Sequence, residues 1–311
     1  MPRMAADLTM RFRGRAVVPG GGPFVVGILN VTPDSFSDGG KYFDPAAAVE
    51  AGCRMADEGA DVIDVGGEST RPGSGYVPAD EQIRRTQPVI AELAKRFRVH
   101  PETLESHRRD AGATRISGCT VSPGGPAISI DTRLAAVAKA ALDAGATIIN
   151  DVSALRDDQA LAHLAADRGA GVVLMHMKGT PADMQHKPAY RDVVGEIREF
   201  WEDRIAAAVR AGIPRERIIV DPGIGFGKTT AHNLEILGRL AELRELLVPV
   251  MVGPSRKRFI GEVLGIEQPA DRLMGTMAAV AACVLAGVEL VRVHDVAAAR
   301  QVADMCRAIR G

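Results

Sequence analysis

The stretch Gly27-Ile-Leu-Asn-Val-Thr-Pro-Asp-Ser-Phe-Ser-Asp-Gly-Gly40 decides the fold. The apolar run from Phe24 to Leu29 predicts a buried strand, which ends at Asn30 and passes into a polar loop containing Pro33 and a pair of glycines. Parallel strands deliver polar side chains and loops in this way to one end of a sheet, where α/β enzymes keep their chemistry. The stretch therefore favours an α/β enzyme.

Short apolar strands alternate with amphipathic helical stretches along most of the chain. The expected strands are 24–30, 61–66, 127–131, 147–151, 171–176, 217–221, 248–252 and 290–294. The expected helices are 45–58, 79–97, 133–144, 158–168, 189–211, 231–243, 271–286 and 296–309. Eight such pairs within 311 residues predict one (β/α)₈ TIM barrel as a single domain over 1–311, with 1–22 as an N-terminal extension. A doubly wound sheet is the alternative, but the Gly-rich turn that usually follows its first strand is not in the sequence.

The segment 99–126 interrupts this alternation with prolines, glycines and little periodicity. It joins a helix to the next strand, so it should lie at the N-terminal end of the barrel, away from the chemistry. We expect an irregular surface insertion before the third strand, not a second domain.

Composition narrows the classes of function. The formal net charge of −1 gives no electrostatic basis for binding nucleic acid or a membrane, and the apolar runs are too short to span a bilayer. Cys53, Cys119, Cys283 and Cys306 lack C-x-x-C spacing and are expected to be reduced thiols. The arginines near the N-terminus precede no apolar core of a signal peptide, and we expect a cytoplasmic protein.

Nearly every expected strand ends in a polar or ionisable side chain. These residues are Asn30, Thr70, Arg71, Asp131, Asn150, Asp151, His176, Asp221, Ser255, Lys257, Arg292 and His294. Helix capping could explain any one of them, but it explains poorly why all the strands end this way. In a barrel they converge on one mouth, which is therefore the predicted binding site.

The sequence resembles dihydropteroate synthases, beginning with their opening signature at Asn30-Val-Thr-Pro-Asp-Ser-Phe-Ser37. The family's later segments follow in order at 61–73, 128–132, 148–153, 220–228, 252–258 and 290–296. The resemblance covers the chain apart from the N-terminal extension and the insertion. It implies condensation of 6-hydroxymethyl-7,8-dihydropterin diphosphate with p-aminobenzoate, giving 7,8-dihydropteroate and pyrophosphate.

Asp131, Asn150 and Asp221 supply hydrogen-bond acceptors and one amide, which suit the donor-rich edge of a pterin. The two carboxylates would also stabilise a developing positive centre. The resemblance implies that Lys257 bonds the pterin and borders the aminobenzoate pocket, with Ser255 near the aminobenzoate carboxylate. Asp131, Asp221 and Lys257 are the expected catalytic residues.

Arg292 and His294 alternate onto one face of the last strand. The resemblance implies that they hold the diphosphate together with Asn30. TIM barrels commonly bind phosphate around their last two strands, in agreement with this assignment. The expected cofactor is Mg²⁺, held mainly by the diphosphate, with Asn30 as its protein ligand.

Two loops, 32–40 and 69–75, are expected to form the aminobenzoate pocket. Thr70 and Arg71 suit an anionic group, while Phe36 and Pro72 would bound an aromatic ring. The resemblance implies that these loops close over bound pterin diphosphate, and that sulfonamides compete with p-aminobenzoate.

Three further residues complete the expectations. The segment 223–229 fails the nucleotide-binding pattern because Pro222 stands where a Gly is required, so Phe226 is interpreted as packing near the ligand ring. Met175 is expected to form a wall of the ring pocket, and His176 to be structural. A corrinoid-dependent pterin methyltransferase and a non-catalytic paralogue remain alternatives, and a homodimer is expected from the resemblance.

Overall fold

A computed structural model of the chain describes residues 9–32, 44–68, 75–97, 125–180, 184, 186 and 188–311, together with the backbone of 114–116 and 119–121. Eight strands form one parallel sheet: β3 (Phe24–Asn30), β4 (Val62–Gly66), β7 (Ala127–Asp131), β8 (Ile148–Asp151), β9 (Gly171–Met175), β10 (Ile218–Asp221), β11 (Met251–Val252) and β12 (Leu290–Val293). Their order is β10-β9-β8-β7-β4-β3-β12-β11. A parallel bridge between Val220 and Val250 joins the two outer strands, so the sheet closes into the expected (β/α)₈ barrel.

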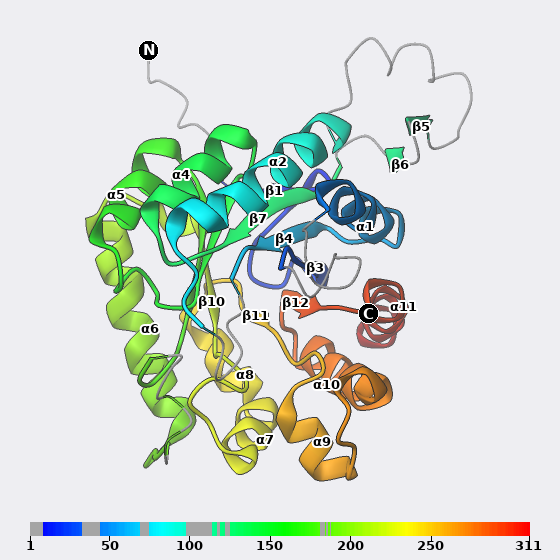
Figure 1. Ribbon diagram of the computed structural model, residues 1–311. Coiled ribbons are helices and arrows are strands. Elements are labelled where there is room, and N and C mark those ends of the chain that lie inside the picture. Colours follow the sequence, from blue (N-terminus) through cyan, green and yellow to red (C-terminus); the bar gives the residue numbers. More distant parts are fainter. Residues whose placement is uncertain are drawn as a thin grey trace, which may run out of the picture.

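Helices cover the outside of the barrel (Figure 1). They are α1 (Pro45–Asp57), α2 (Ala79–Phe97), α4 (Ala135–Ala144), α5 (Gln159–Arg168), α6 (Val193–Arg210), α7 (Thr230–Gly238), α8 (Leu240–Leu243), α9 (Arg258–Leu264), α10 (Leu273–Leu285) and α11 (Val296–Arg310). Asp44, Asp158 and Asp192 cap α1, α5 and α6 through side-chain bonds to backbone N–H groups, so α6 begins at Val193 and not at the expected residue 189. Within the described residues, no helix has both the length and the apolar character needed to cross a membrane.

Alternate residues of each strand face two different hydrophobic cores, an arrangement called strand parity below. On β3, Val25 and Leu29 face the helices, while Phe24 and Val26 face the barrel interior with Val62, Ile148, Val173, Ile219, Met251 and Leu290. Successive inward positions stack in layers along the barrel axis, as usual for this fold. The inward position nearest the carboxyl end of each strand is therefore the one that reaches the mouth.

The N-terminal extension closes the opposite end of the barrel. Its short hairpin, β1 (Arg11–Phe12) and β2 (Arg15–Ala16), inserts Phe12 into the interior core, where its ring meets Phe24 edge-on at 5.4 Å between centroids. Gly171 leaves room for this extension, because a Cβ there would lie only 2.4 Å from the sulfur of Met10.

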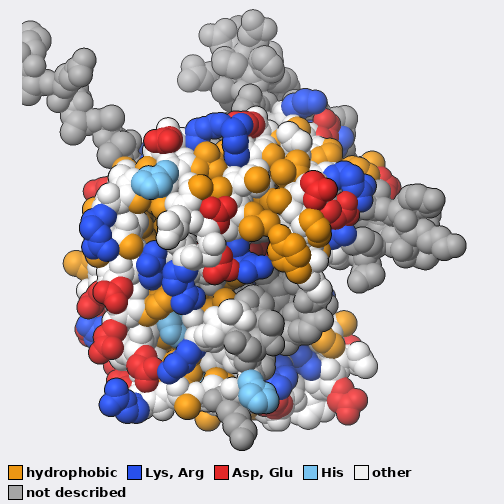
Figure 2. Space-filling view, turned by 60° about the vertical axis from the view of Figure 1, so that its left-hand side comes forward, with side chains coloured by type: hydrophobic (Ala, Val, Ile, Leu, Met, Phe, Trp, Pro, Cys, Tyr) orange, Lys and Arg blue, Asp and Glu red, His pale blue; other side chains and the backbone are white. Residues whose placement is uncertain are grey.

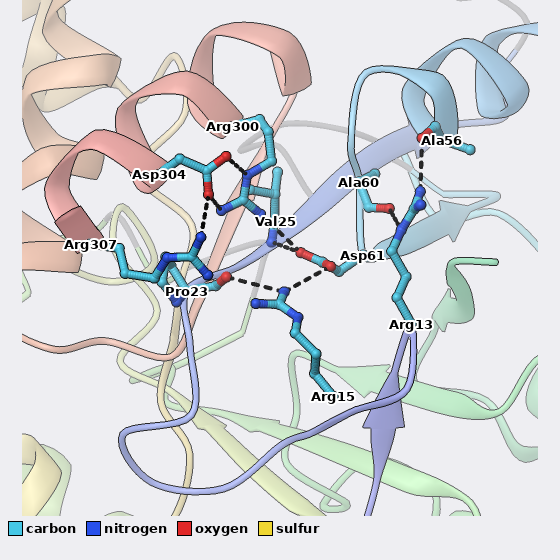
Figure 3. A network of polar contacts seen from close by, with 10 residues as sticks. All are labelled: Arg13, Arg15, Pro23, Val25, Ala56, Ala60, Asp61, Arg300, Asp304 and Arg307. Atoms are coloured by element: carbon cyan, nitrogen blue, oxygen red, sulfur yellow. Dashed lines mark hydrogen bonds and ion pairs between the residues drawn. The ribbon is translucent and has the colours of Figure 1, made fainter. Parts of the chain in front are cut away.

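Asp61, a buried carboxylate, connects several elements at this closed end. Asp61 accepts hydrogen bonds from the backbone N–H of Val25 (2.9 Å), from Arg15 of the hairpin (2.9 Å) and from Arg300 of α11 (3.2 Å), as Figure 3 shows. Arg13 donates to the carbonyl oxygens of Ala56 and Ala60. The charged network links the extension to β3, to Asp61 just before β4, and to α11.

The structure corrects several expected boundaries. The strand expected at 248–252 is only two residues long, Met251–Val252. The helix expected at 231–243 is divided at Arg239 into α7 and α8, and α9 was not predicted because its seven residues are too few to show a helical period. The insertion was expected to be irregular but contains an antiparallel hairpin, β5 (Thr114–Ile116) and β6 (Cys119–Val121).

On the face shown in Figure 2, Lys and Arg side chains are interspersed with Asp and Glu.

Candidate active site

Strand parity brings most of the predicted residues together at the mouth. A cavity of about 430 Å³ there is lined by Asn30, Asp131, Phe226, Ser255, Lys257, Arg292 and His294, among others. A smaller recess of about 20 Å³ adjoins it and is lined by Asn150, Met175 and Asp221 as well as Asp131, Phe226, Lys257 and Arg292. The larger cavity and the recess therefore form one site, with its polar floor in the recess.

The floor is built around Arg292. Its Nε donates to Oδ2 of Asp64 at 2.7 Å, and one terminal nitrogen donates to Oδ2 of Asp131 at 2.9 Å. The amide nitrogen of Asn150 donates to the same oxygen of Asp64 at 2.9 Å. Arg292 thus lies against two carboxylates, whereas the sequence assigned it to the diphosphate.

Burial shapes the electrostatics of the floor. It raises the pKa of Asp131 to about 7, with Arg292 opposing the rise and the neighbouring carboxylates Asp64, Asp151 and Glu68 adding to it. Burial also raises the pKa of Asp221, against the bond from the backbone N–H of Gly223 and the charges of Lys257, Arg292 and Lys228. Both carboxylates lack enough partners to offset their desolvation and are poised to gain from a ligand that donates hydrogen bonds.

Gly223 is required where the chain turns away from Asp221. Its φ is +66°, and a Cβ there would lie 2.1 Å from the carbonyl oxygen of His176. Its N–H donates to Oδ1 of Asp221 at 2.7 Å. The backbone after β10 therefore runs close beside β9, which brings Phe226 to the wall of the cavity.

The three consecutive basic residues after β11 have different partners. Arg256 makes a bidentate pair with Asp295 at 2.6 and 3.1 Å, and Arg258 pairs with Glu262 at 3.1 Å on the surface of α9. Lys257 instead extends along the cavity wall, with its Nζ 4.2 Å from the centre of the Phe226 ring. Lys257 therefore lines both the recess and the outer cavity.

Ser255 and His294 face each other across the loop ends of β11 and β12. The Ser255 hydroxyl lies 3.0 Å from Nδ1 of His294 and accepts the His294 backbone N–H at 3.2 Å. Both line the outer cavity together with Asn30 and Arg292. These four residues are therefore neighbours in one part of the cavity.

The residues near Asn30 suit a weakly held metal. In the part of the chain that the structure describes, no three His, Cys, Asp or Glu side chains cluster as a metal site. Asn30 offers a carboxamide oxygen at the cavity, and Mg²⁺ is commonly held by one or two protein oxygens plus substrate phosphates. The donor set fits Mg²⁺ that arrives with a diphosphate better than a resident metal.

His176 lies in the core behind the site. Its Nδ1 is 3.0 Å from Nζ of the buried Lys228, and its ring meets Phe200 edge-on. Burial and the nearby Lys228 lower the pKa of His176 to about 2, while burial lowers the pKa of Lys228 to about 7. Lys228 also donates to the carbonyl oxygens of His176 and Phe226, so it ties together the loops after β9 and β10.

Four predicted site residues lie outside the described residues: Phe36, Thr70, Arg71 and Pro72. Conversely, sequence reasoning missed Asp64 and Lys228. An acidic residue at an inward position of an otherwise apolar strand was the available signal for Asp64. For Lys228 the signal was the Gly-rich turn before it, which was considered only as a nucleotide motif.

Comparisons with known proteins agree with this geometry. A family described as "Pterin binding enzyme" matches residues 26–108 and 120–294. The dihydropteroate synthase of Escherichia coli K12 is 41% identical over 274 residues, 88% of this chain and 87% of that protein. A Haloferax volcanii protein named probable bifunctional folylpolyglutamate synthase/dihydropteroate synthase is 45% identical over 88% of this chain, which spans only 29% of that longer protein.

The fold agrees with solved structures as well. The dihydropteroate synthase of Xanthomonas albilineans, solved with 4-aminobenzoic acid, superposes with a TM-score of 0.81 at 43% identity, covering 97% of this chain and 99% of the other. By its sequence, its barrel and its pocket, the chain belongs to the dihydropteroate synthases of the pterin-binding enzyme family.

Proposed function

We propose that the barrel joins 6-hydroxymethyl-7,8-dihydropterin diphosphate to p-aminobenzoate, giving 7,8-dihydropteroate and pyrophosphate. The observation that carries the proposal is the floor of Asp131, Asn150 and Asp221 in a recess that opens into a cavity of about 430 Å³. The donor-rich edge of a flat ring can meet this floor while the rest of the ring, the aromatic amine and the diphosphate occupy the outer cavity. The related structure from Xanthomonas albilineans holds 4-aminobenzoic acid, which supports the choice of the second substrate.

The pterin is held by its edge. The carboxylates of Asp131 and Asp221 accept its ring N–H and amino groups, and the carboxamide of Asn150 completes the row. Met175 and Phe226 bound the ring, and Lys257 donates to the pterin carbonyl from the recess wall. The two carboxylates also stabilise the positive charge that spreads over the pterin when the diphosphate departs.

The leaving group occupies the outer cavity beside Asn30, Ser255 and His294. There Arg292 donates to the diphosphate while it stays bonded to Asp64 and Asp131, because a guanidinium has five N–H donors. Asn30 would hold Mg²⁺, which would neutralise part of the diphosphate charge when it is bound. The bond between the pterin's methylene carbon and the diphosphate oxygen breaks first. The amine nitrogen of p-aminobenzoate then attacks that carbon and loses a proton.

No strong base is required, since an arylamine is already a nucleophile. The chain's own contribution is positioning and charge stabilisation. Phe36, Thr70, Arg71 and Pro72, which lie outside the described residues, are expected from the sequence to contact the aminobenzoate. Binding is ordered, with pterin diphosphate first, and sulfonamides compete for the second site.

Pyrophosphate release tests this function directly. Purified protein with Mg²⁺ and the pterin diphosphate should release pyrophosphate rapidly only when p-aminobenzoate is added, and chromatography should detect 7,8-dihydropteroate in equal amount. His294→Ala should weaken pyrophosphate binding far more than binding of 6-hydroxymethyl-7,8-dihydropterin, because His294 lines the outer cavity and not the recess. Pyrophosphate release without formation of dihydropteroate would contradict the proposed reaction.

The functional form is a homodimer built on the late helices. Large apolar side chains are exposed on α10 and α11: Met274 (78%), Leu285 (48%), Met305 (62%) and Ile309 (65%). A second copy would cover them with the same surface, as two-fold dimers do. Sedimentation should find a dimer that Met274→Lys with Met305→Lys converts to monomer.

A cytoplasmic location agrees with the free buried thiols Cys53, Cys283 and Cys306.

A further inference from the structure

Asp64 lies one layer below the mouth, inside the barrel. It is on β4 and is 1% exposed, paired in register with Ser129 of β7 and Ile28 of β3. Its Oδ2 accepts both Nε of Arg292, at 2.7 Å, and Nδ2 of Asn150, at 2.9 Å. One oxygen therefore holds two residues that line the recess.

The contact with Asn150 fixes the orientation of its carboxamide. An ionised carboxylate only accepts hydrogen bonds, so the amide must turn its NH₂ group toward Asp64. The amide oxygen and the second N–H are then presented in one arrangement only. With a neutral partner that both donates and accepts, the amide could turn over and offer the ligand a donor where an acceptor is needed.

The contact with Arg292 fixes a plane. Nε of Arg292 donates to Asp64, and one terminal nitrogen of the same guanidinium donates to Asp131. Two carboxylates at two edges leave the guanidinium little freedom to rotate. Because Arg292 lines both the recess and the outer cavity, its plane affects the pterin and the leaving group together.

Asp64 is poorly suited to a purely structural role. Its Oδ1 is buried, and the described residues give it no hydrogen-bond partner; the same holds for Oγ of Ser129. Both residues line an interior cavity of about 10 Å³ with otherwise mainly apolar walls, enough for about one water molecule. A buried carboxylate with one unpartnered oxygen is weak evidence for a gain in stability, so a role in the site is the explanation to test.

We propose that Asp64 is a positioning residue for the reaction: from beneath the floor it fixes the amide of Asn150 and the guanidinium of Arg292 in the arrangement that recognises the pterin. The inference rests on the proposed pterin floor. It assigns Asp64 no contact with substrate, so its effect must pass through its two partners.

The test compares ligand affinity with stability. Asp64→Asn keeps the shape of the side chain but can itself donate, so Asn150 is no longer held in one orientation. Calorimetry should find 6-hydroxymethyl-7,8-dihydropterin bound about tenfold more weakly, the scale of one disrupted buried hydrogen-bond arrangement. The thermal midpoint should fall as well, because the buried Arg292 loses one of its two carboxylate partners, so the change in affinity is the result that identifies a positioning role. A lower midpoint with normal affinity would overturn the proposal, and Asp64→Ser, which also lacks the charge, provides the same comparison if the first variant does not fold.

A double-mutant cycle separates this inference from the proposed floor. Asn150→Ala should weaken pterin binding, and adding Asp64→Asn to it should then cost clearly less than in the wild-type background. Normal affinity in Asn150→Ala would remove the floor assignment itself, whereas a loss there with normal affinity in Asp64→Asn would overturn only the role of Asp64. Fully additive losses would also overturn it. Ser129→Ala is the matched control, since it borders the same cavity without touching the floor, and should bind pterin normally.

Discussion

The pH dependence of pterin affinity gives a sharp test of the floor. Burial raises the pKa of Asp131 to about 7, from 3.8 for an exposed carboxyl, with Asp64, Asp151 and Glu68 adding to the rise and Arg292 opposing it. With a pKa near 7, about 3% of Asp131 is ionised at pH 5.5 and about 90% at pH 8. If the ionised carboxylate alone accepts the pterin N–H groups, affinity for 6-hydroxymethyl-7,8-dihydropterin should increase about thirtyfold over this range.

Stability of the unliganded protein should change in the opposite direction. Because the folded-state pKa of Asp131 lies above its unfolded value, the folded protein binds more protons than the unfolded chain between about pH 4 and 7. The stability contributed by protonated Asp131 is fully present below the unfolded pKa and is lost as pH rises through about 7. One group thus predicts rising affinity and falling stability over the same interval.

Calorimetry at several pH values, with thermal unfolding of the unliganded protein alongside, measures both effects. Asp131→Asn should lose most of the pH dependence of affinity and stay near the low affinity that wild type shows at pH 5.5. This variant also controls for titration of the ligand itself, which it would leave intact. Wild-type affinity that stays constant from pH 5.5 to 8, or a variant that retains the full slope, would refute the reasoning.

Three further predictions concern other parts of the chain. Lys257→Ala should lower kcat/KM by roughly 10²-fold, the scale of losing a preorganised charged donor, and near-normal turnover in a folded variant would remove Lys257 from the site. Asp61→Asn should lower the free energy of unfolding by about 2–4 kcal/mol, because it weakens a buried carboxylate's bonds to Val25, Arg15 and Arg300, and it should leave KM for the pterin diphosphate unchanged in a folded sample. Replacing 99–125 by a short Gly/Ser link should preserve most of the activity, and loss of turnover with the fold intact would show that the insertion supports the site.

Local patterns in the sequence were enough to predict the barrel and the polar side chains at the ends of its strands. In β3 the inward positions are Phe24, Val26 and Ile28, so the same parity carries Asn30 to the mouth. Parity likewise puts Asp131 and Asn150 in the recess. Predictions of this kind succeed because each depends on a few neighbouring residues and on a fold whose strands all end at one mouth.

The partners of Arg292 could not be predicted in the same way. Its bond to Asp64 joins residues 228 positions apart, and it exists only because β12 pairs with β3 and β3 with β4. Sequence alone gave Arg292 a charge and a place at the mouth, from which an anionic ligand was the natural partner. The three-dimensional structure adds two carboxylates within hydrogen-bonding distance and so changes what the unliganded side chain does.

The buried carboxylates at the two ends of the barrel differ in how fully they are hydrogen-bonded. At the closed end, Glu289 is 1% exposed and accepts from the backbone of Gly20 (2.8 Å) and Val250 (2.9 Å) and from Arg244 (3.0 Å). Asp61 is bonded in the same way, so both buried carboxylates have charged and backbone partners.

At the open end, burial raises the pKa of both Asp131 and Asp221, which means that their desolvation is only partly offset. A ligand rich in N–H donors would supply the bonds that these carboxylates lack, and the binding free energy would include relief of that desolvation. If the floor were bonded as fully as Asp61 and Glu289 are, the protein would be more stable and would have less to gain from a pterin. The well-bonded closed end therefore allows the barrel to keep a poorly bonded floor where it binds its substrate.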